Sequence, residues 1–145
     1  MSTANKEISR RFTELFSTGD ETLAGQILSR DVVFHGMAGD GELRGVDEMM
    51  RFVAAYRRAF PDARSTVEDQ VAEGDKVVTR WRARGTHQGQ LGPIAATGRE
   101  FEMDGVTIER IADGRIAEVW VGRDELGLLT QLGVLPQPDP EVVVS

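Results

Sequence analysis

A few side chains in this sequence carry groups that can move protons or donate hydrogen bonds to a substrate. His35 is one of two histidines, and imidazole is the side chain best suited to proton transfer near pH 7. Tyr56 carries the single tyrosine hydroxyl, which can donate to a substrate carbonyl. Glu102 and Asp104 stand two residues apart in a segment typical of a strand, so their carboxylates share one face, either toward a pocket or at a solvated edge. We therefore take His35, Tyr56 and Asp104 as the catalytic candidates, with Glu102 as a second carboxylate.

Other conspicuous residues favour structural interpretations. His87, within GTHQG at 85–89, is expected to form a structural hydrogen bond at a turn. Trp81 is expected to face a pocket, and Trp120 to pack in the core or against a second subunit. The alternating arginines at 80, 82 and 84 are typical of a solvated or inter-subunit face paired with acidic groups.

Composition excludes several classes of function. The 145 residues contain no cysteine, which excludes disulfides and thiolate chemistry, and two histidines exclude a three-histidine metal site. The net charge of −7 argues against a nucleic-acid partner. No apolar run is long enough to span a membrane, and the polar N-terminus lacks the pattern of a signal peptide. These observations predict a soluble cytoplasmic protein with no metal, and the sequence lacks the glycine-rich motifs of nucleotide cofactors.

Hydrophobic periodicity changes along the chain from helical to alternating. Apolar residues at helical spacing predict helices at 2–19, 21–29, 47–60 and 124–132. Alternating or β-branched segments predict strands at 31–35, 64–72, 77–86, 99–111 and 115–121, with tight turns at 73–76 and 112–114. The glycine-rich segments 36–45 and 87–98 are predicted loops.

This order of elements predicts an α+β fold with one domain over 1–135 and a proline-rich tail at 136–145. N-terminal helices are expected to lie on one face of a curved antiparallel sheet. Such an arrangement leaves a conical hollow between helix and sheet, which suits a small-molecule ligand.

Five segments together resemble the SnoaL-like polyketide cyclase family, which has the nuclear transport factor 2-like fold. They are YRRAFPD at 56–62, VAEGDKVV at 71–78, GTHQG at 85–89, RIADGRI at 110–116 and DELGLLTQLG at 124–133. The resemblance covers about residues 5–135. It implies a cone-shaped α+β barrel, usually a homodimer, with a deep pocket and no metal or organic cofactor. It also implies a ring-closing activity on a polyketide, often an aldol step.

The sequence departs from this family at its best-known catalytic positions. The family resemblance implies a histidine where this chain has Thr107 and a catalytic aspartate where it has Val121. Ketosteroid isomerases of the same fold carry an aspartate near Gly36 or Met37, which is also missing here. His35 stands where the family often places a polar pocket group.

Alternation along the strands then predicts an almost wholly apolar pocket. The expected substrate-binding residues are Met37, Met49, Phe52, Val53, Trp81, Ala83, Phe101, Met103, Thr107, Val119 and Val121. A bulge in the strand at 99–111 would reverse its faces and bring Glu102 and Asp104 inward.

Three functions remain open at this point. The favoured one is a cyclase without a cofactor that folds a hydrophobic polyketide-type chain into a reactive shape, including for a [4+2] cycloaddition. The second is an acid–base aldol cyclase, isomerase or hydrolase that uses His35 with Asp104 or Glu102. The third is a non-catalytic module that binds small molecules. A homodimer is expected in each case.

Overall fold

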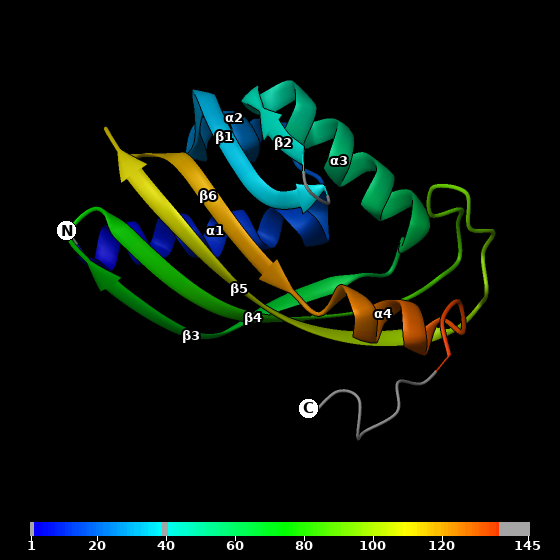
Figure 1. Ribbon diagram of the computed structural model, residues 1–145. Coiled ribbons are helices and arrows are strands. Elements are labelled where there is room, and N and C mark those ends of the chain that lie inside the picture. The colour runs from blue at the N-terminus through cyan, green and yellow to red at the C-terminus, as the bar shows by residue number, and fades with distance from the viewer. Residues whose placement is uncertain (1, 39–40, 137–145) are drawn as a thin grey trace.

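The computed structural model describes residues 2–38 and 41–136 of the chain. Of the predicted tail at 136–145, only Pro136 lies among the described residues. The chain begins with two helices, continues into a strand hairpin and a third helix, and then forms four consecutive strands before a short last helix (Figure 1).

The helices begin and end close to the positions that periodicity predicts. They are α1 (Ser2–Thr18), α2 (Glu21–Ile27), α3 (Gly45–Ala59) and α4 (Glu125–Gln131). Asp20 caps α2, since its carboxylate accepts hydrogen bonds from the backbone N–H groups of Thr22 and Leu23. Asp124 caps α4 by accepting from the N–H of Gly127. Pro61 follows α3 closely, because proline cannot continue a helix.

The strands form one six-stranded sheet in the order β2-β1-β6-β5-β4-β3. Their bounds are β1 (Leu28–Ala38), β2 (Gly41–Arg44), β3 (Arg64–Glu73), β4 (Lys76–Thr86), β5 (Glu100–Ala112) and β6 (Arg115–Arg123). The predicted α+β class is confirmed, with N-terminal helices against a curved sheet. The sheet is open between its edge strands β2 and β3, and it is mixed rather than wholly antiparallel, because β1 runs parallel to β6.

The predicted loop at 36–45 is partly wrong. β1 continues through Gly36 to Ala38, and β2 pairs back onto it with Leu43 opposite Phe34. Gly36 makes this possible: its φ is +82°, and a Cβ at this position would collide with the carbonyl oxygen of Val121 on the neighbouring strand. Pairing with β2 therefore keeps this segment in a strand, with an irregularity between His35 and Ala38, where glycine content alone favours a loop.

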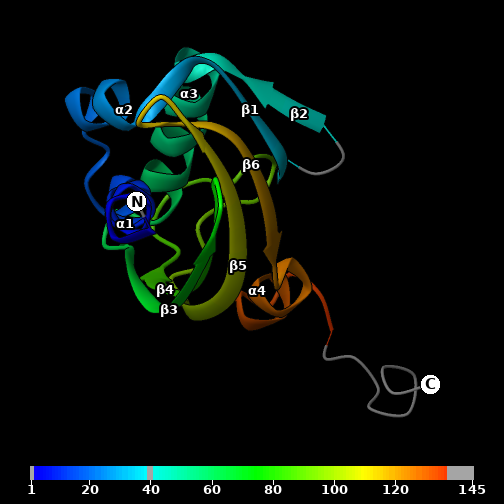
Figure 2. The same ribbon diagram turned by 90° about the vertical axis from the view of Figure 1, so that its left-hand side faces the viewer.

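The curved sheet wraps around the helices and places the core on its concave side. Figure 2, in which α1 is seen end on, shows β3, β4, β5 and β6 curving around one side of that helix. Phe12 and Leu15 of α1, Phe34 of β1 and Met49 of α3 meet in this core and are almost fully buried. A second cluster, which includes Phe60, Phe101 and Leu132, closes the other end of the sheet beneath α4.

Two further expectations concern the rest of the described chain. His87 is completely buried, and its Nδ1 accepts a hydrogen bond from the backbone N–H of Thr97, so the structural interpretation of this histidine is confirmed. None of the described helices is both long and apolar enough to cross a membrane.

Candidate active site

A cavity lies between the concave face of the sheet and helices α1 and α3. It contains about 500 Å³ of space free of protein atoms, part of it open to solvent. The residues that line it come from both helices and from five strands: Phe12, Thr13, Phe16, Met37, Phe52, Tyr56, Ser65, Trp81, Ala83, Met103, Thr107, Val121 and Arg123.

The sheet supplies its part of the wall in successive cross-strand rows. The pairing of β4 with β5 is continuous over both strands, so every second residue of each faces inward. From the end of the sheet near α4 toward the first core cluster, the rows are Ala83–Met103, then Trp81–Gly105–Arg123, then Thr79–Thr107–Val121, and finally Val77–Glu109–Val119.

Trp81 forms a flat side of the cavity. Its indole lies across Gly105 on the neighbouring strand, where any Cβ would collide with the ring. The indole Nε1 donates a hydrogen bond to Oγ1 of Thr107 over 2.8 Å. This polar group of Trp81 is therefore already used within the protein, and the residue contributes mainly apolar surface to a ligand.

Tyr56 of α3 also lines the cavity. Its ring packs edge-on against Phe16 and lies beside Phe60. Burial raises the pKa of Tyr56 from 10.0 to about 12, although the positive charges of Arg123 and Arg57 oppose this effect. The phenol therefore keeps its proton at neutral pH and acts as a hydrogen-bond donor rather than as a base.

Arg123 ends β6 and places its guanidinium at the cavity wall. The group lies over the ring of Phe52, with Cζ 5.6 Å from the ring centroid. Nη2 donates to the carbonyl oxygen of Met37 over 2.6 Å and lies 3.1 Å from Oε1 of Glu125. Arg123 was not among the predicted site residues, although the alternation that selected Val119 and Val121 places it on the same face.

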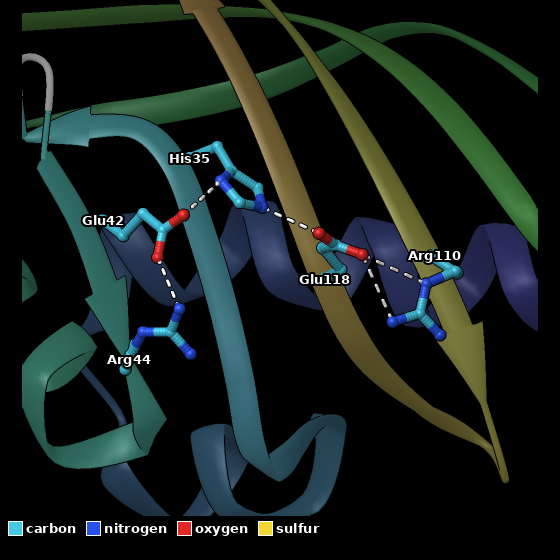
Figure 3. Close-up of polar contacts among 5 residues, drawn as sticks. All are labelled: His35, Glu42, Arg44, Arg110 and Glu118. Carbon is cyan, nitrogen blue, oxygen red and sulfur yellow. Dashed lines mark hydrogen bonds and ion pairs between the residues drawn. The ribbon is translucent and has the colours of Figure 1, made fainter.

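His35 lies outside the cavity, contrary to expectation. Its side chain projects from the outer face of the sheet, where Nε2 lies 2.8 Å from Oε2 of Glu118 and Nδ1 lies 3.4 Å from Oε1 of Glu42 (Figure 3). The ring also stacks on Trp120, with centroids 5.5 Å apart. The cause is register: Phe34 is fully buried on the inner face, so the next residue along β1 must point outward.

This outer network is held by charge. The hydrogen bond from His35 lowers the pKa of the Glu118 carboxyl, helped by Arg110, whose Nε and Nη2 each lie 3.3 Å from Oε1 (Figure 3). Arg44 lies 2.7 Å from the other carboxylate that His35 contacts, Glu42. The network fixes His35 against the sheet and directs its ring away from any ligand in the cavity.

Glu102 and Asp104 also point away from the cavity. The bulge that would bring them inward is absent, because the β4–β5 register runs without interruption from Lys76 opposite Arg110 to Thr86 opposite Glu100. Arg82 pairs instead with both carboxylates, 2.8 Å from Asp104 and 3.1 Å from Glu102, on the exposed outer face. The placement of Asp104 as a pocket carboxylate is therefore corrected.

The predicted substrate-binding residues divide between the cavity and the core. Those that line the cavity with Tyr56 are Met37, Phe52, Trp81, Ala83, Met103, Thr107 and Val121. Those that are instead packed in the core are Met49, Val53, Phe101 and Val119. These four residues lie on the predicted inner face, but they are packed among other core side chains and do not line the cavity. Sequence reasoning missed Phe12, Thr13, Phe16 and Ser65, of which the first three belong to the apolar side of α1.

Comparison with known proteins matches this chain to one family. The family model of the SnoaL-like polyketide cyclases matches residues 6–132. The aklanonic acid methyl ester cyclase of Streptomyces peucetius is 30% identical over 137 residues, which cover 93% of this chain and 94% of the relative. The chain belongs to the SnoaL-like polyketide cyclase family.

Solved structures agree with this assignment. IdmH of Streptomyces antibioticus is 35% identical and superimposes with a TM-score of 0.79, covering 90% of this chain and 99% of that one. TsrD of Streptomyces laurentii is 29% identical with a TM-score of 0.83, covering 93% and 98% of the two chains. The SnoaL-like family is a family of polyketide cyclases, which are enzymes.

At two positions the cavity of this SnoaL-like protein differs from the pattern that the family resemblance implies. Thr107 and Val121, where the family resemblance implies a histidine and an aspartate, lie directly opposite each other on β5 and β6 and both line the cavity. A threonine hydroxyl bound by Trp81 and an isopropyl group occupy this pair of positions. Among the lining residues of the described chain there is no carboxylate and no imidazole.

One carboxyl group does face inward, one row deeper than Thr107. Glu109 is almost completely buried, and its Oε1 accepts a hydrogen bond from the hydroxyl of Ser9 over 2.9 Å. Thr79 and Gln70 continue the hydrogen-bonded chain from that hydroxyl. Burial raises the pKa of Glu109 from 4.5 to about 8, and the bond from Ser9 only partly opposes this. The strand alternation that selected Thr107 also predicts this inward position.

Replacement of Gly105 tests the contact that shapes the cavity. In Gly105→Ala the new methyl group displaces the indole of Trp81 and breaks its bond to Thr107, so we expect a loss of about 1–3 kcal/mol in the free energy of unfolding. Urea denaturation followed by circular dichroism measures this loss. Gly122→Ala is the control, since the nearest atom to its Cβ is 4.0 Å away. Equal stability of the two variants would contradict the predicted contact.

The buried Glu109 predicts an unusual dependence of stability on pH. Because the pKa of about 8 in the folded protein lies above the ordinary 4.5, the folded state holds the proton more tightly. The free energy of unfolding is then highest at low pH from this source and falls by up to about 1.4 kcal/mol per pH unit as the pH rises toward 8. Glu109→Gln removes this slope and is more stable than wild type at pH 9.

Urea denaturation at pH 5, 7 and 9 measures both proteins. Glu102→Gln, on the exposed outer face, is the matched control and retains the wild-type slope. Parallel curves for wild type and Glu109→Gln would show that the carboxyl is ionised throughout this range.

Proposed function

We propose that this protein is a polyketide cyclase that works without a cofactor, by folding a largely apolar linear chain in its cavity until the reacting carbons meet. Family membership and the aklanonic acid methyl ester cyclase relative support a polyketide-type substrate. The apolar wall supports a hydrophobic one, because Phe12, Phe52, Trp81 and Val121 present mainly carbon atoms to the ligand.

The observation that carries the proposal is the composition of the cavity wall at Thr107 and Val121. Neither residue is an acid or base at neutral pH, and the carboxylates and imidazole considered from sequence lie on the outer face of the sheet. A reaction that needs no proton transfer fits this wall better than an aldol step. An intramolecular [4+2] cycloaddition is such a reaction, since it exchanges π bonds for σ bonds within one molecule.

The catalytic effect then comes mainly from conformation. A flexible chain rarely brings its two reacting ends together in water, and holding them at reacting distance supplies up to about 7–11 kcal/mol of the barrier in ideal cases. The flat indole of Trp81 and the rings of Phe16 and Phe52 restrict the shapes that a bound chain can adopt. Tyr56 adds a neutral hydrogen-bond donor that polarises a substrate carbonyl conjugated with one reacting partner.

The test is conversion of the linear intermediate. We expect deletion of the gene to accumulate an uncyclised compound, and purified protein to convert that compound to the ring faster than buffer alone. A cycloaddition product has the same mass as its precursor, whereas aldol condensation followed by dehydration loses one water, so mass spectrometry distinguishes the two. Tyr56→Phe slows the conversion about tenfold, the value of one hydrogen bond to a polarised carbonyl.

His35→Ala is the control for mechanism. It leaves the conversion rate near that of wild type if the cavity works by folding its substrate. A loss of about 10²–10⁴ in rate would instead support acid–base catalysis by this histidine. Binding of the intermediate without any conversion would support a non-catalytic binding module, and equal rates with and without protein would refute the cyclase.

We also propose that the protein is a homodimer that pairs through the outer face of the sheet. One cross-strand row on this face is Val71, Val78, Ile108, Trp120 and His35, in neighbouring pairs from β3 to β1. Val71 is 62% exposed and Ile108 36% exposed in the single chain. A row made mostly of apolar residues across a sheet face is typical of a protein–protein contact.

Substitution of Ile108 tests this interface. Ile108→Lys places a charge in the centre of the row and is expected to convert the dimer to a monomer, as measured by light scattering after size-exclusion chromatography. Leu126→Lys, at an exposed position on α4, is the control and remains dimeric. A wild-type protein that is monomeric at all concentrations would end this proposal.

A further inference from the structure

Arg123 is the one lining residue of the described cavity that carries a permanent charge. The side chain is only 17% exposed, and the surrounding wall is apolar. A cation in such a place loses hydration, and this costs free energy unless other groups compensate. The face of the Phe52 ring and the carbonyl of Met37 provide part of this compensation.

The guanidinium retains donors that the protein does not use. Both polar contacts of Arg123, to Met37 and to Glu125, are made by Nη2. Within the described residues, Nε and Nη1 have no hydrogen-bond partner. Arginine presents its N–H groups as a planar fork that matches the two oxygens of a carboxylate.

The negative charges nearby leave Arg123 only partly neutralised. Glu125 lies on the solvent side and is 56% exposed, so water screens its attraction strongly. The carboxylate of Asp124 is directed to the backbone N–H of Gly127 at the start of α4. Tyr56 is a neutral phenol. A further anion is therefore favoured at the cavity side of Arg123.

We propose that Arg123 binds a carboxylate at one end of the substrate, so that this cyclase takes acidic chains rather than neutral esters. The inference rests on the proposed function, since it assigns the substrate of the same cavity. With the carboxylate held at Arg123, the apolar chain extends past Trp81 and Val121 toward Phe12. The anchor fixes which carbons of the chain lie beside Tyr56 and thereby selects the ring that forms.

A matched pair of polyenes tests the anchor without the unknown substrate. All-trans-retinoic acid and its methyl ester share one hydrophobic chain and differ in the terminal carboxylate, and both quench tryptophan fluorescence. We expect wild-type protein to bind the acid about 10- to 100-fold more tightly than the ester at pH 7.5, the value of a hydrogen-bonded charge pair. In Arg123→Gln this preference disappears, because the acid loses affinity while the ester retains it.

Three further variants control the experiment. Arg84→Gln, an exposed arginine on the outer face, keeps the wild-type preference for the acid. Glu125→Gln removes the competing carboxylate and strengthens binding of the acid. Arg123→Lys retains the charge without the planar fork and keeps part of the preference, which separates loss of the anchor from loss of the fold.

Two results would overturn the anchor. One is equal binding of acid and ester by the wild-type protein. The other is an equal loss of affinity for both ligands in Arg123→Gln, together with the same affinities in Arg123→Lys. Either result leaves the cyclase proposal intact if the linear intermediate is still converted. Conversely, an Arg123-dependent preference for the acid in a protein that converts no intermediate would support the anchor and refute the cyclase.

Discussion

The unbroken pairing of β4 with β5 is the constraint on which the rest of the site depends. Each residue of β5 has its face decided by this register, so Met103 and Thr107 reach the cavity while Glu102 and Asp104 face solvent beside Arg82. Gly105 belongs to the same constraint, because the indole of Trp81 can cross the sheet only above a residue without a side chain. A shift of one residue would replace the apolar wall with carboxylates.

The composition of the cavity wall suits the proposed mechanism, in which the protein restricts the conformation of its substrate. Aromatic and aliphatic side chains supply most of the wall, and the polar groups are confined to a few positions. Tyr56 supplies a proton-bearing donor, and Arg123 a fixed positive charge at the end of β6. In the proposed mechanism, a chain held by its polar groups at these positions and by its carbon atoms along Trp81 has little conformational freedom left to lose before the ring closes.

A cluster of polar residues lies beneath the cavity, so the interior of the protein on this side of the sheet is not wholly apolar. Glu109, Ser9 and Thr79 occupy positions where aliphatic side chains would pack with less cost in desolvation. The protonated form of the carboxyl reduces that cost at neutral pH. The stability of the sheet is therefore expected to depend on pH through Glu109, one row below Thr107. The hydrogen bond between His35 and Glu118 lies on the opposite face of the sheet.

Local pattern determined much of this protein from sequence alone. Helical spacing located α1 and α3, and strict alternation along β5 and β6 placed Thr107 and Val121 on the inner face, because neighbouring side chains in a strand must point to opposite sides. Alternation did not decide how far an inward residue lies from the cavity: Val121 lines it, and Val119 is sealed in the core. That depth depends on the helices packed above each row.

Only the tertiary structure decided the orientation of His35. The residue lies in β1, a strand that pairs in parallel with β6, more than eighty positions away in the chain, as its contact with Glu118 at a separation of 83 residues shows. The sequence around His35 does not show which side of β1 faces the helices, because Phe34 becomes buried only when β6 and α3 pack against this strand. The inner and outer faces of a strand exist only after its neighbours have assembled, and for that reason the residue types alone did not place the imidazole of His35 on the outer face of the sheet.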